Sequence, residues 1–519
     1  MRARSEIPFH PRSDCQGTFW LTWIPTYSDL FIWGRVGLKI GRSKLDSDFP
    51  ASCFHYGPER TPISSRSLSN RFPSPVRSVI GCEGPFALVL LVLFALATSS
   101  HTVSAQTLPP VPVPPENPIT PEKAVLGKIL FWDEQLSSDD TVACGTCHLP
   151  ENSGTDPRVA IHPGLDALFG NADDVFGTQG VVRRNSSGVA IVDPIFGTSP
   201  QVTGRSAPSA FQSLFAPNIF WDGRAGDIFV DPLSPTTVLI PNGGALESQA
   251  ILPILSSVEM AKDGRTWAEV TAKLAGIVPL AIATDLPGDI VSALAANPIY
   301  PDLFNAAFGT PTITPSRIAF AIATYERTLV ADQTPFDQFV AGDLAALSPA
   351  QQTGLNFFTV SPCSICHPAP LFTGDRFKNI GLRDPAEDLG REGATGASGD
   401  RAEFKVPSLR GAGLKTRFMH TGQITSVNDA VLFYDPAQFH FPTNLDVAIP
   451  IAVPALILPD LVDFIENGLT DPRLAARAPP FDRPTLTSEL GAPESVPTLA
   501  PLWLCGLAVG LTALGLHFR

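Results

Sequence analysis

The chain has 519 residues, of which 44% are hydrophobic, and its formal net charge is −14 at pH 7. This acidic balance argues against a nucleic-acid partner and suits a basic redox partner. The length is more than one compact domain usually needs.

Residues 1–105 are interpreted as a leader that precedes the fold. Phe86 to Thr98 is an apolar run of signal-peptide length, with Arg77 ahead of it and a small-x-small cleavage site at 103–105. The run is shorter than the roughly 20 apolar residues that a transmembrane helix needs. A signal peptide at about 80–105 predicts a periplasmic or otherwise extracytoplasmic protein.

Two proline-rich stretches, 106–121 and 478–498, are predicted to be extended, semi-rigid linkers. The part between them is long enough for two domains, expected at 122–314 and 315–477.

Apolar periodicity predicts three helices within this part of the chain. One runs from Glu122 to Phe131, an amphipathic one from Ser316 to Val330, and one from Pro349 to Phe358. Alternating β patterns are scarce. The expected fold class is therefore mainly α with long loops.

The pattern Cys-x-x-Cys-His occurs twice, at 144–148 and at 363–367. It is typical of covalent haem c attachment, in which two thiols bond the porphyrin vinyl groups and the histidine binds the iron. The predicted attachment residues and proximal iron ligands are Cys144, Cys147, His148, Cys363, Cys366 and His367. The alternatives are a zinc site, which usually needs its ligands clustered, and a redox dithiol, which does not account for an adjacent histidine twice.

The other cysteines, Cys15, Cys53, Cys82 and Cys505, lie outside residues 106–489. Every thiol of the expected body is thus committed to haem, which fits an oxidising compartment. Two haem c groups imply a protein that moves electrons or activates an oxidant.

Further motifs follow in a fixed order between Glu122 and Asp435. They are LGKILF at 126–131, GRSAP at 204–208, FWDGR at 220–224, LESQA at 246–250, VEM at 258–260, FKVPSLR at 404–410 and MHTG at 419–422. Together they resemble the bacterial di-haem cytochrome c peroxidases, a family that includes the MauG-type oxidases. The resemblance implies two cytochrome c-like domains. The first haem would react with hydrogen peroxide, and the second would relay electrons from a small redox protein such as a cytochrome c.

The resemblance also implies roles for three side chains. Glu259 would be the distal acid–base group that moves a proton between the peroxide oxygens, and Gln249 would hydrogen-bond the peroxide, with Pro253 in the same pocket. Trp221 would lie between the haems as an electron relay. The structural alternatives are a helix cap for Glu259, a surface position for Gln249 and a core position for Trp221.

The distal ligand of the second haem distinguishes branches of the family. Peroxidases of the family have a methionine fourteen residues after the histidine of His-x-Gly, and here that place, counted from His420, is Tyr434. The MauG-type branch has tyrosine there, and an anionic phenolate stabilises Fe(III). Tyr434 is therefore the predicted ligand and Met419 the alternative. His162 is an alternative distal ligand of the first haem.

The resemblance further implies calcium between the domains, although Ser206 stands where the family has asparagine. The corresponding backbone carbonyls belong to Lys415 and Arg417. An acidic loop at 166–174 is expected to be solvated rather than to bind calcium.

Residues 499–519 form an apolar tail that ends in Arg519 and resembles bacterial C-terminal sorting tails. Membrane contact is expected only through this tail. The leading hypothesis is a di-haem peroxidase. A MauG-type oxidase that modifies a partner protein is the first alternative, and a non-catalytic di-haem electron carrier is the second.

Overall fold

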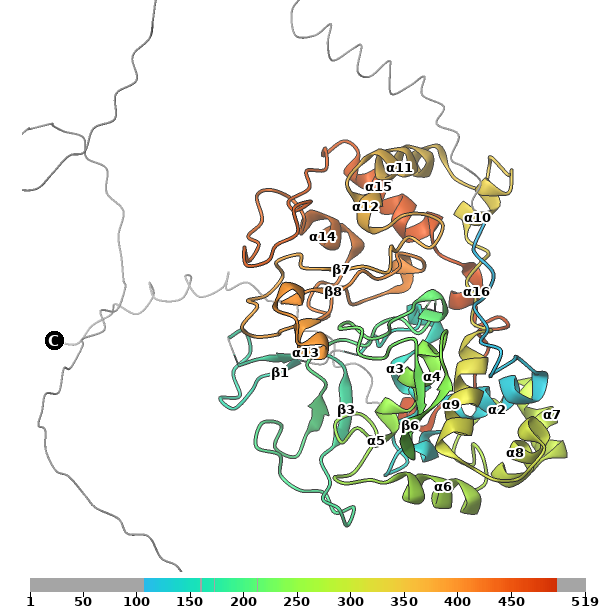
Figure 1. Cartoon of the computed structure of the whole chain (residues 1–519). Helices are drawn as coiled ribbons and strands as arrows, with labels where there is room; N and C mark the ends of the chain where they lie inside the picture. The colour runs from blue at the N-terminus through green and yellow to red at the C-terminus, as the bar shows by residue number, and fades with distance from the viewer. Residues whose placement is uncertain (1–106, 159–160, 172, 212, 492–519) are drawn as a thin grey trace, which may run out of the picture. The chain divides into compact units, whose positions relative to one another are not determined.

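The computed structural model describes residues 107–491 except 159–160, 172 and 212. The predicted signal peptide and C-terminal tail lie outside the described residues. Two large hydrophobic cores lie within the described part. Figure 1 shows the first around α2 and α9 and the second around α11 and α15.

The first half of the described chain supplies most of the first core. Its helices are α2 (Pro121–Trp132), α3 (Cys144–Cys147), α4 (Ala245–Ala250), α5 (Leu252–Leu255), α6 (Trp267–Gly276), α7 (Gly288–Ala296), α8 (Tyr300–Phe308) and α9 (Pro315–Glu326). Three short 3₁₀ turns join them, η1 (Glu134–Leu136), η2 (Pro150–Asn152) and η3 (Ser213–Phe215).

The second half builds the second core and then returns to the first. Its helices are α10 (Pro335–Val340), α11 (Pro349–Val360), α12 (Cys363–Cys366), α13 (Glu392–Thr395), α14 (Val427–Leu432), α15 (Leu458–Asp463), α16 (Pro472–Ala475) and α17 (Thr487–Leu490). Two 3₁₀ turns, η4 (Ser398–Asp400) and η5 (Ala412–Leu414), and one π turn, η6 (Phe464–Gly468), complete it.

The described β structure consists of four two-stranded antiparallel pairs. These are β1 (Ile161–His162) with β2 (Val175–Phe176), β3 (Gln179–Val182) with β4 (Pro200–Val202), β5 (Phe229–Asp231) with β6 (Ser234–Ile240), and β7 (Phe377–Lys378) with β8 (Phe404–Lys405). The β5–β6 pair buries Phe229 and Ile240 against Ala319 of α9. The expectation of helices and long loops is thus met, with short hairpins added.

The principal helices begin in the same way. Thr120, Thr314 and Ser348 each accept a hydrogen bond from a backbone N–H of the first turn of the following helix, and a proline follows each of them. The hydroxyl satisfies a backbone donor that has no partner within the helix, and proline already has a helical φ. These caps fix the starts of α2, α9 and α11 close to where the sequence predicts them.

Each core contains one helix crossing at which glycine is required. A Cβ on Gly127 of α2 would lie 1.9 Å from the carbonyl oxygen of Ala321 in α9. A Cβ on Gly354 of α11 would lie 2.2 Å from the carbonyl oxygen of Asp460 in α15. Both distances are far below van der Waals contact, so the backbones approach as closely as they do only because these residues have no side chain.

The structure changes the expected helix between the halves. The predicted amphipathic helix 316–330 is α9, which ends at Glu326 and has buried residues on all its faces. α9 packs against α2 and belongs to the first core. A domain border at residue 314 would therefore separate α9 from the core to which it belongs. The sequence showed that this helix is apolar and roughly how long it is. It did not show which elements, such as α2 and α4, cover the helix on its different sides.

The two proline-rich stretches are anchored to the body rather than free. Asn117 in the first is fully buried and donates to the carboxylate of Glu247 at 2.8 Å. In the second, Phe481 and Leu486 are fully buried in the first core, and Arg483 bonds Glu151 at 2.5 Å. An extended, proline-rich backbone therefore does not imply a linker when apolar residues at intervals can pack.

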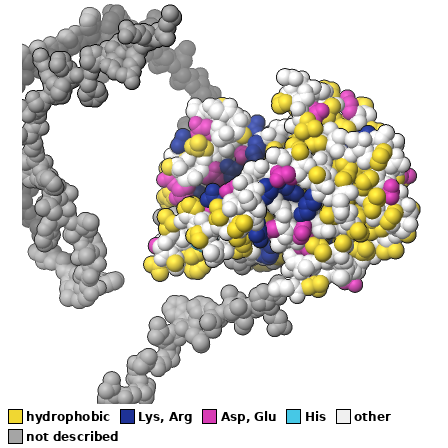
Figure 2. Space-filling view, turned by 90° about the horizontal axis from the view of Figure 1, so that it is seen from below, with side chains coloured by type: hydrophobic (Ala, Val, Ile, Leu, Met, Phe, Trp, Pro, Cys, Tyr) yellow, Lys and Arg dark blue, Asp and Glu magenta, His cyan; other side chains and the backbone are white. Residues whose placement is uncertain are grey.

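The surface carries both signs of charge. Figure 2 shows Lys and Arg side chains gathered in the middle of one face, with acidic side chains among them. The acidic excess of the whole chain is therefore not spread evenly. Within residues 107–491, leaving out the few positions not placed, no helix has the length and apolar content needed to cross a membrane.

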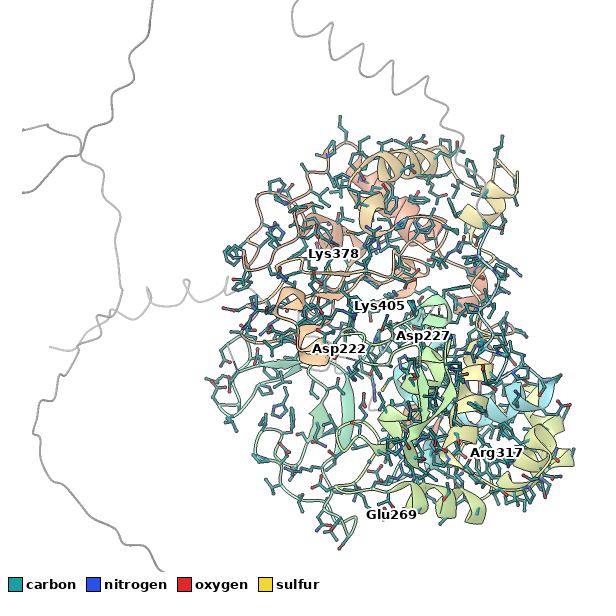
Figure 3. The ribbon with its side chains drawn as sticks, in the orientation of Figure 1. Asp222, Asp227, Glu269, Arg317, Lys378 and Lys405 are labelled. Atoms are coloured by element: carbon teal, nitrogen blue, oxygen red, sulfur yellow. The ribbon has the colours of Figure 1, made fainter. Side chains whose placement is uncertain are left out.

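The two cores meet along a polar boundary. Arg205 from the first half binds Asp388 from the second at 2.7 Å and also Asp222 at 2.7 Å. The backbone N–H of Lys405 donates to the carbonyl oxygen of Trp221 at 2.7 Å. Figure 3 labels Asp222 and Lys405 at this boundary. Bidentate and backbone bonds of this kind fix the orientation of the cores relative to each other.

Replacing Gly127 with alanine is expected to destabilise the protein by about 1–3 kcal/mol, because the added methyl group forces the α2–α9 backbones apart. Gly276 at the end of α6 is a matched control, since a Cβ there meets no atom within 4 Å. Thermal and urea unfolding of both variants measure the difference. Equal stability of the two variants would show that the crossing tolerates a side chain.

Candidate active site

The first cavity has a volume of about 550 Å³ and contains the first cysteine motif in its wall. Cys144, Cys147 and His148 line one part of it, and Gln249 and Glu259 line another. Pro253 also lines it. The structure therefore brings together the residues that the sequence analysis assigned to the peroxide-reactive haem. Their roles remain predictions.

A buried ion pair positions Gln249. Both Arg327, which follows α9, and Glu247 of α4 are almost inaccessible to solvent, and they bind through two contacts of 2.6 and 3.0 Å. Gln249 lies two residues after Glu247 in the short helix α4. Removing one partner of a buried ion pair leaves an uncompensated charge and strongly destabilises a protein. The Glu247–Arg327 pair therefore holds α4 firmly against the end of α9.

Glu259 lies in a tight turn that Ser256 organises. The carbonyl oxygen of Ser256 accepts hydrogen bonds from the backbone of residues 259–261, and its hydroxyl accepts from the N–H of Glu259 at 3.3 Å. Burial raises the pKa of Glu259, while Ser256 and the charge of Arg224 act in the opposite direction. A raised pKa makes a carboxyl group hold its proton more readily than an ordinary carboxylate does, which suits acid–base work in a cavity.

The two motif histidines are oriented in the same way. Nδ1 of His148 lies 2.8 Å from the carbonyl oxygen of Gly154, and Nδ1 of His367 lies 3.0 Å from that of Phe372. Nδ1 is thus the donor, and Nε2 is left available for a metal. Burial lowers the pKa of both, to about 4 for His367, so both rings are neutral, as ligation requires.

The second cavity has a volume of about 200 Å³ and contains the second motif. Cys363, Cys366 and His367 line it together with both candidate distal ligands, Met419 and Tyr434. Burial raises the pKa of Tyr434, and the nearby cysteine thiols act in the same direction. A tyrosine that is neutral without a metal becomes a phenolate only when a cation compensates its charge.

One wall separates the two cavities. Residues 206–209 and Trp221 line both of them. The indole Nε1 of Trp221 donates to the carbonyl oxygen of Ser206 at 2.7 Å, which fixes the ring in this wall. The ring centroid lies 6.3 Å from that of His420, which lines the second cavity.

Comparison with known proteins gives the family. The model of the di-haem cytochrome c peroxidases matches residues 121–345. The methylamine utilization protein MauG of Methylophilus methylotrophus is 30% identical over 359 residues, which cover 66% of this chain and 84% of that protein. This chain belongs to the di-haem cytochrome c peroxidase family.

Two further relatives agree with this assignment. The cytochrome c551 peroxidase of Nitrosomonas europaea is 28% identical over 367 residues, covering 69% of this chain and 86% of that protein. A crystal structure of a MauG-like protein associated with microbial copper homeostasis has a TM-score of 0.50 and 24% identity, and covers 72% of this chain and 96% of that one. The likeness to the cytochrome c551 peroxidase, together with the family, shows that this chain is an enzyme of the peroxidase class. The likeness to the crystal structure shows the fold.

Membership of the family implies haem c, and the donor sets of both cavities fit it. Each cavity combines two thiols one helical turn apart with a neutral histidine whose Nε2 is available. In the second cavity Nε2 of His420 is buried without a hydrogen-bond partner among the described residues. An unsatisfied buried group of this kind is expected where a ligand belongs.

Two cations of the second cavity also lack acidic partners within hydrogen-bond reach. Burial lowers the pKa of Lys415 to about 8, and it also lowers the pKa of Arg417, which Asp156 opposes. Neither side chain forms a hydrogen bond or ion pair in the described part of the chain. Because a partly buried cation without a counterion is costly, these half-buried side chains suit the carboxylates of haem propionates.

The remaining predicted ligands are placed elsewhere. His162 of β1 packs its ring against Phe196 at 4.9 Å and is not among the residues that line the first cavity. At the expected calcium position, the hydroxyl of Ser206 donates to the carbonyl oxygen of Met419 at 2.9 Å, so calcium stays a prediction. Among the described residues no group of three or more acidic, histidine or cysteine side chains could hold a metal.

The sequence analysis did not identify three contributions to the site. It missed the cationic side chains of Lys415 and Arg417, the Glu247–Arg327 pair, and the carboxyl of Glu326, which also lines the first cavity. Charged residues inside otherwise apolar segments were the available signal, since such charges are rarely buried without a reason. Their partners are far apart in sequence and only the fold reveals them.

Replacing Lys415 with methionine is expected to lower the midpoint potential of the second haem by tens of millivolts, because a nearby positive charge favours the reduced form. Lys378→Met is the matched control, since Lys378 lines the same cavity but is already paired with Asp446 at 2.7 Å. Spectroelectrochemical titration of both variants measures the shifts. A larger shift for Lys378 would contradict the proposed propionate contact.

Proposed function

We propose that this protein reduces hydrogen peroxide in the His148 cavity with electrons that arrive through the His367 cavity. The observation that carries the proposal is the presence of Glu259, with its raised pKa, and Gln249 in the wall of the same cavity as the first cysteine motif. An electron carrier needs no acid–base group beside its haem. The two side chains therefore favour an enzyme over a non-catalytic di-haem carrier.

The protein's own groups have defined tasks in this proposal. Haem c, when bound to each motif, supplies the iron at which peroxide is held or electrons are passed. Glu259 takes the proton from one peroxide oxygen and delivers it to the other, which must leave as water. Gln249 donates its amide N–H to the peroxide and so fixes its orientation, and α4 holds Gln249 in place.

Trp221 is proposed to couple the two cavities electronically. Its ring belongs to the wall that both cavities share, and its indole nitrogen is anchored to Ser206 rather than free. An aromatic ring in this position shortens the step between the two haems. A small redox protein, such as a cytochrome c, is the proposed electron donor.

The proposed location is extracytoplasmic, because the relatives are peroxidases with c-type haem and the sequence carries a predicted signal peptide. Contact with a membrane, if any, would be confined to residues 499–519. No nucleic-acid partner is proposed. Calcium has no part in the proposed function.

A second candidate function is a MauG-type oxidase that modifies a partner protein. The observation that favours it is Tyr434, which lines the second cavity at the place where that branch has tyrosine. A phenolate ligand would lower the potential of the second haem and let both haems share the oxidation produced by peroxide. The relative with 30% identity is itself named a methylamine utilization protein.

Glu259→Gln is expected to lower the rate of peroxide reduction by about 10²–10⁴-fold, because the amide cannot carry the proton. The assay uses the full-length protein with both haems attached and a reduced cytochrome c as donor. Glu122→Gln, a change on the exposed face of α2, is the control and should keep the wild-type rate. Unimpaired peroxide reduction by Glu259→Gln would remove Glu259 from the mechanism.

Tyr434→Phe is expected to change the optical and EPR spectra of the second haem and to raise its midpoint potential, because an anionic ligand is lost. In the wild type, peroxide added to the fully ferric protein should then remove the ferric EPR signals of both haems. Met419→Leu, in the same cavity, should leave the second-haem spectrum unchanged. The opposite pattern in the two variants would make Met419 the ligand.

A further inference from the structure

Glu326 is a buried carboxylic acid in the wall of the His148 cavity that the proposed function does not use. It is the last residue of α9, its exposed fraction is 4%, and it lines the cavity together with Gln249 and Glu259. Its Oε2 is buried and has no hydrogen-bond partner among the described residues. A buried polar atom without a partner is rare in folded proteins and usually marks a ligand, a water or a catalytic task.

The charges around Glu326 do not compensate the negative charge that its carboxylate would carry. The adjacent Arg327 is bound to Glu247, so its positive charge is already compensated. Burial is the largest effect and raises the pKa of Glu326 to about 8; Arg327 lowers it and Glu247 raises it further. Lys123 of α2 donates to Asn117 rather than to Glu326. The carboxyl group is therefore protonated at neutral pH.

Haem does not satisfy this group. Cys144 lines the same cavity as Glu326; burial raises the pKa of its thiol, and the charge of Glu326 acts in the same direction. Cys144 is the predicted attachment point of a vinyl group, and the vinyl groups and propionates occupy different edges of a porphyrin. The vinyl edge offers neither a hydrogen-bond donor nor an acceptor to a carboxylic acid. Peroxide and water, by contrast, both donate and accept.

We propose that Glu326 is a second proton donor of the His148 cavity, an inference that rests on the proposed function. Reduction of one hydrogen peroxide to two water molecules consumes two electrons and two protons. Glu259 moves a proton that peroxide already carries, so it adds none to the total. Glu326 supplies one of the two protons from its carboxyl group, becomes a carboxylate, and is protonated again from solvent before the next turnover; the other proton comes directly from solvent water, and the two electrons come from the donor through the His367 cavity.

The test compares Glu326→Gln with the wild type in the full-length protein with both haems attached. Infrared difference spectra at neutral pH should show a carboxylic acid band in the wild type that is missing from the variant. The wild-type rate of peroxide reduction should fall as the pH rises through about 8, because the proton is then lost. In Glu326→Gln the maximal rate should be at least tenfold lower, and this decline near pH 8 should disappear. Glu122→Gln should keep both the band and the decline.

Glutamine preserves the shape of the side chain, and circular dichroism with thermal unfolding shows whether the variant is folded. Glu326→Asp, which keeps the acid, should restore part of the rate and the pH dependence. An unchanged pH profile in Glu326→Gln, or a wild type without the acid band, would overturn the donor role while leaving peroxide reduction and the Glu259 effect intact. A wild-type protein that does not reduce peroxide at all would overturn the proposed function and the donor role with it.

Discussion

The contact on which the site depends is the crossing of α2 and α9 at Gly127. α2 leads to the first cysteine motif, and the ring of Trp132 at its end packs directly under Gly145, where a Cβ would lie 2.1 Å from the indole. α9 ends at Glu326 and Arg327, and Arg327 holds α4. One close backbone contact therefore helps to set the distance between His148 and the other residues that line the same cavity, Gln249 and Glu326 among them.

The second core has the same kind of glycine crossing before a cysteine motif, but different side chains line its cavity. Gly354 allows α11 to cross α15, and α11 again leads to a cysteine motif. The side chains that line the two cavities differ in their charge. The first combines two carboxyl groups of raised pKa with an amide, whereas the second combines unpaired cations with a tyrosine and a methionine. The fold supplies two cavities that each contain a Cys-x-x-Cys-His motif, and the lining residues suit one to the proposed proton transfer and the other to holding charge.

The sequence predicted most of what is local and part of what is distant. The cysteine motifs and the starts of α2 and α11 came from spacing and periodicity, whereas the roles predicted for Glu259, Gln249 and Trp221 came from the family resemblance. The predicted helix 316–330 is longer than α9, which ends at Glu326. The apolar pattern in the sequence continues after Arg327, where the helix has already ended. Residues 478–498 were expected to form a linker, but Phe481 packs against Phe211 and Arg483 binds Glu151, both far earlier in the chain. Pairings such as Glu247 with Arg327 depend on tertiary contacts that no periodicity encodes.

The return of the chain to the first core has a consequence for the order in which the protein is made. Leu474, Phe481 and Leu486 belong to the first core, and Arg483 binds Glu151 close to the first cysteine motif. During synthesis and export from the N-terminus, the first core stays incomplete until these residues have emerged. Its cysteines are thus held in an unfinished domain for longer than those of the second motif, so they stay accessible for covalent modification for longer at the site where peroxide is proposed to react.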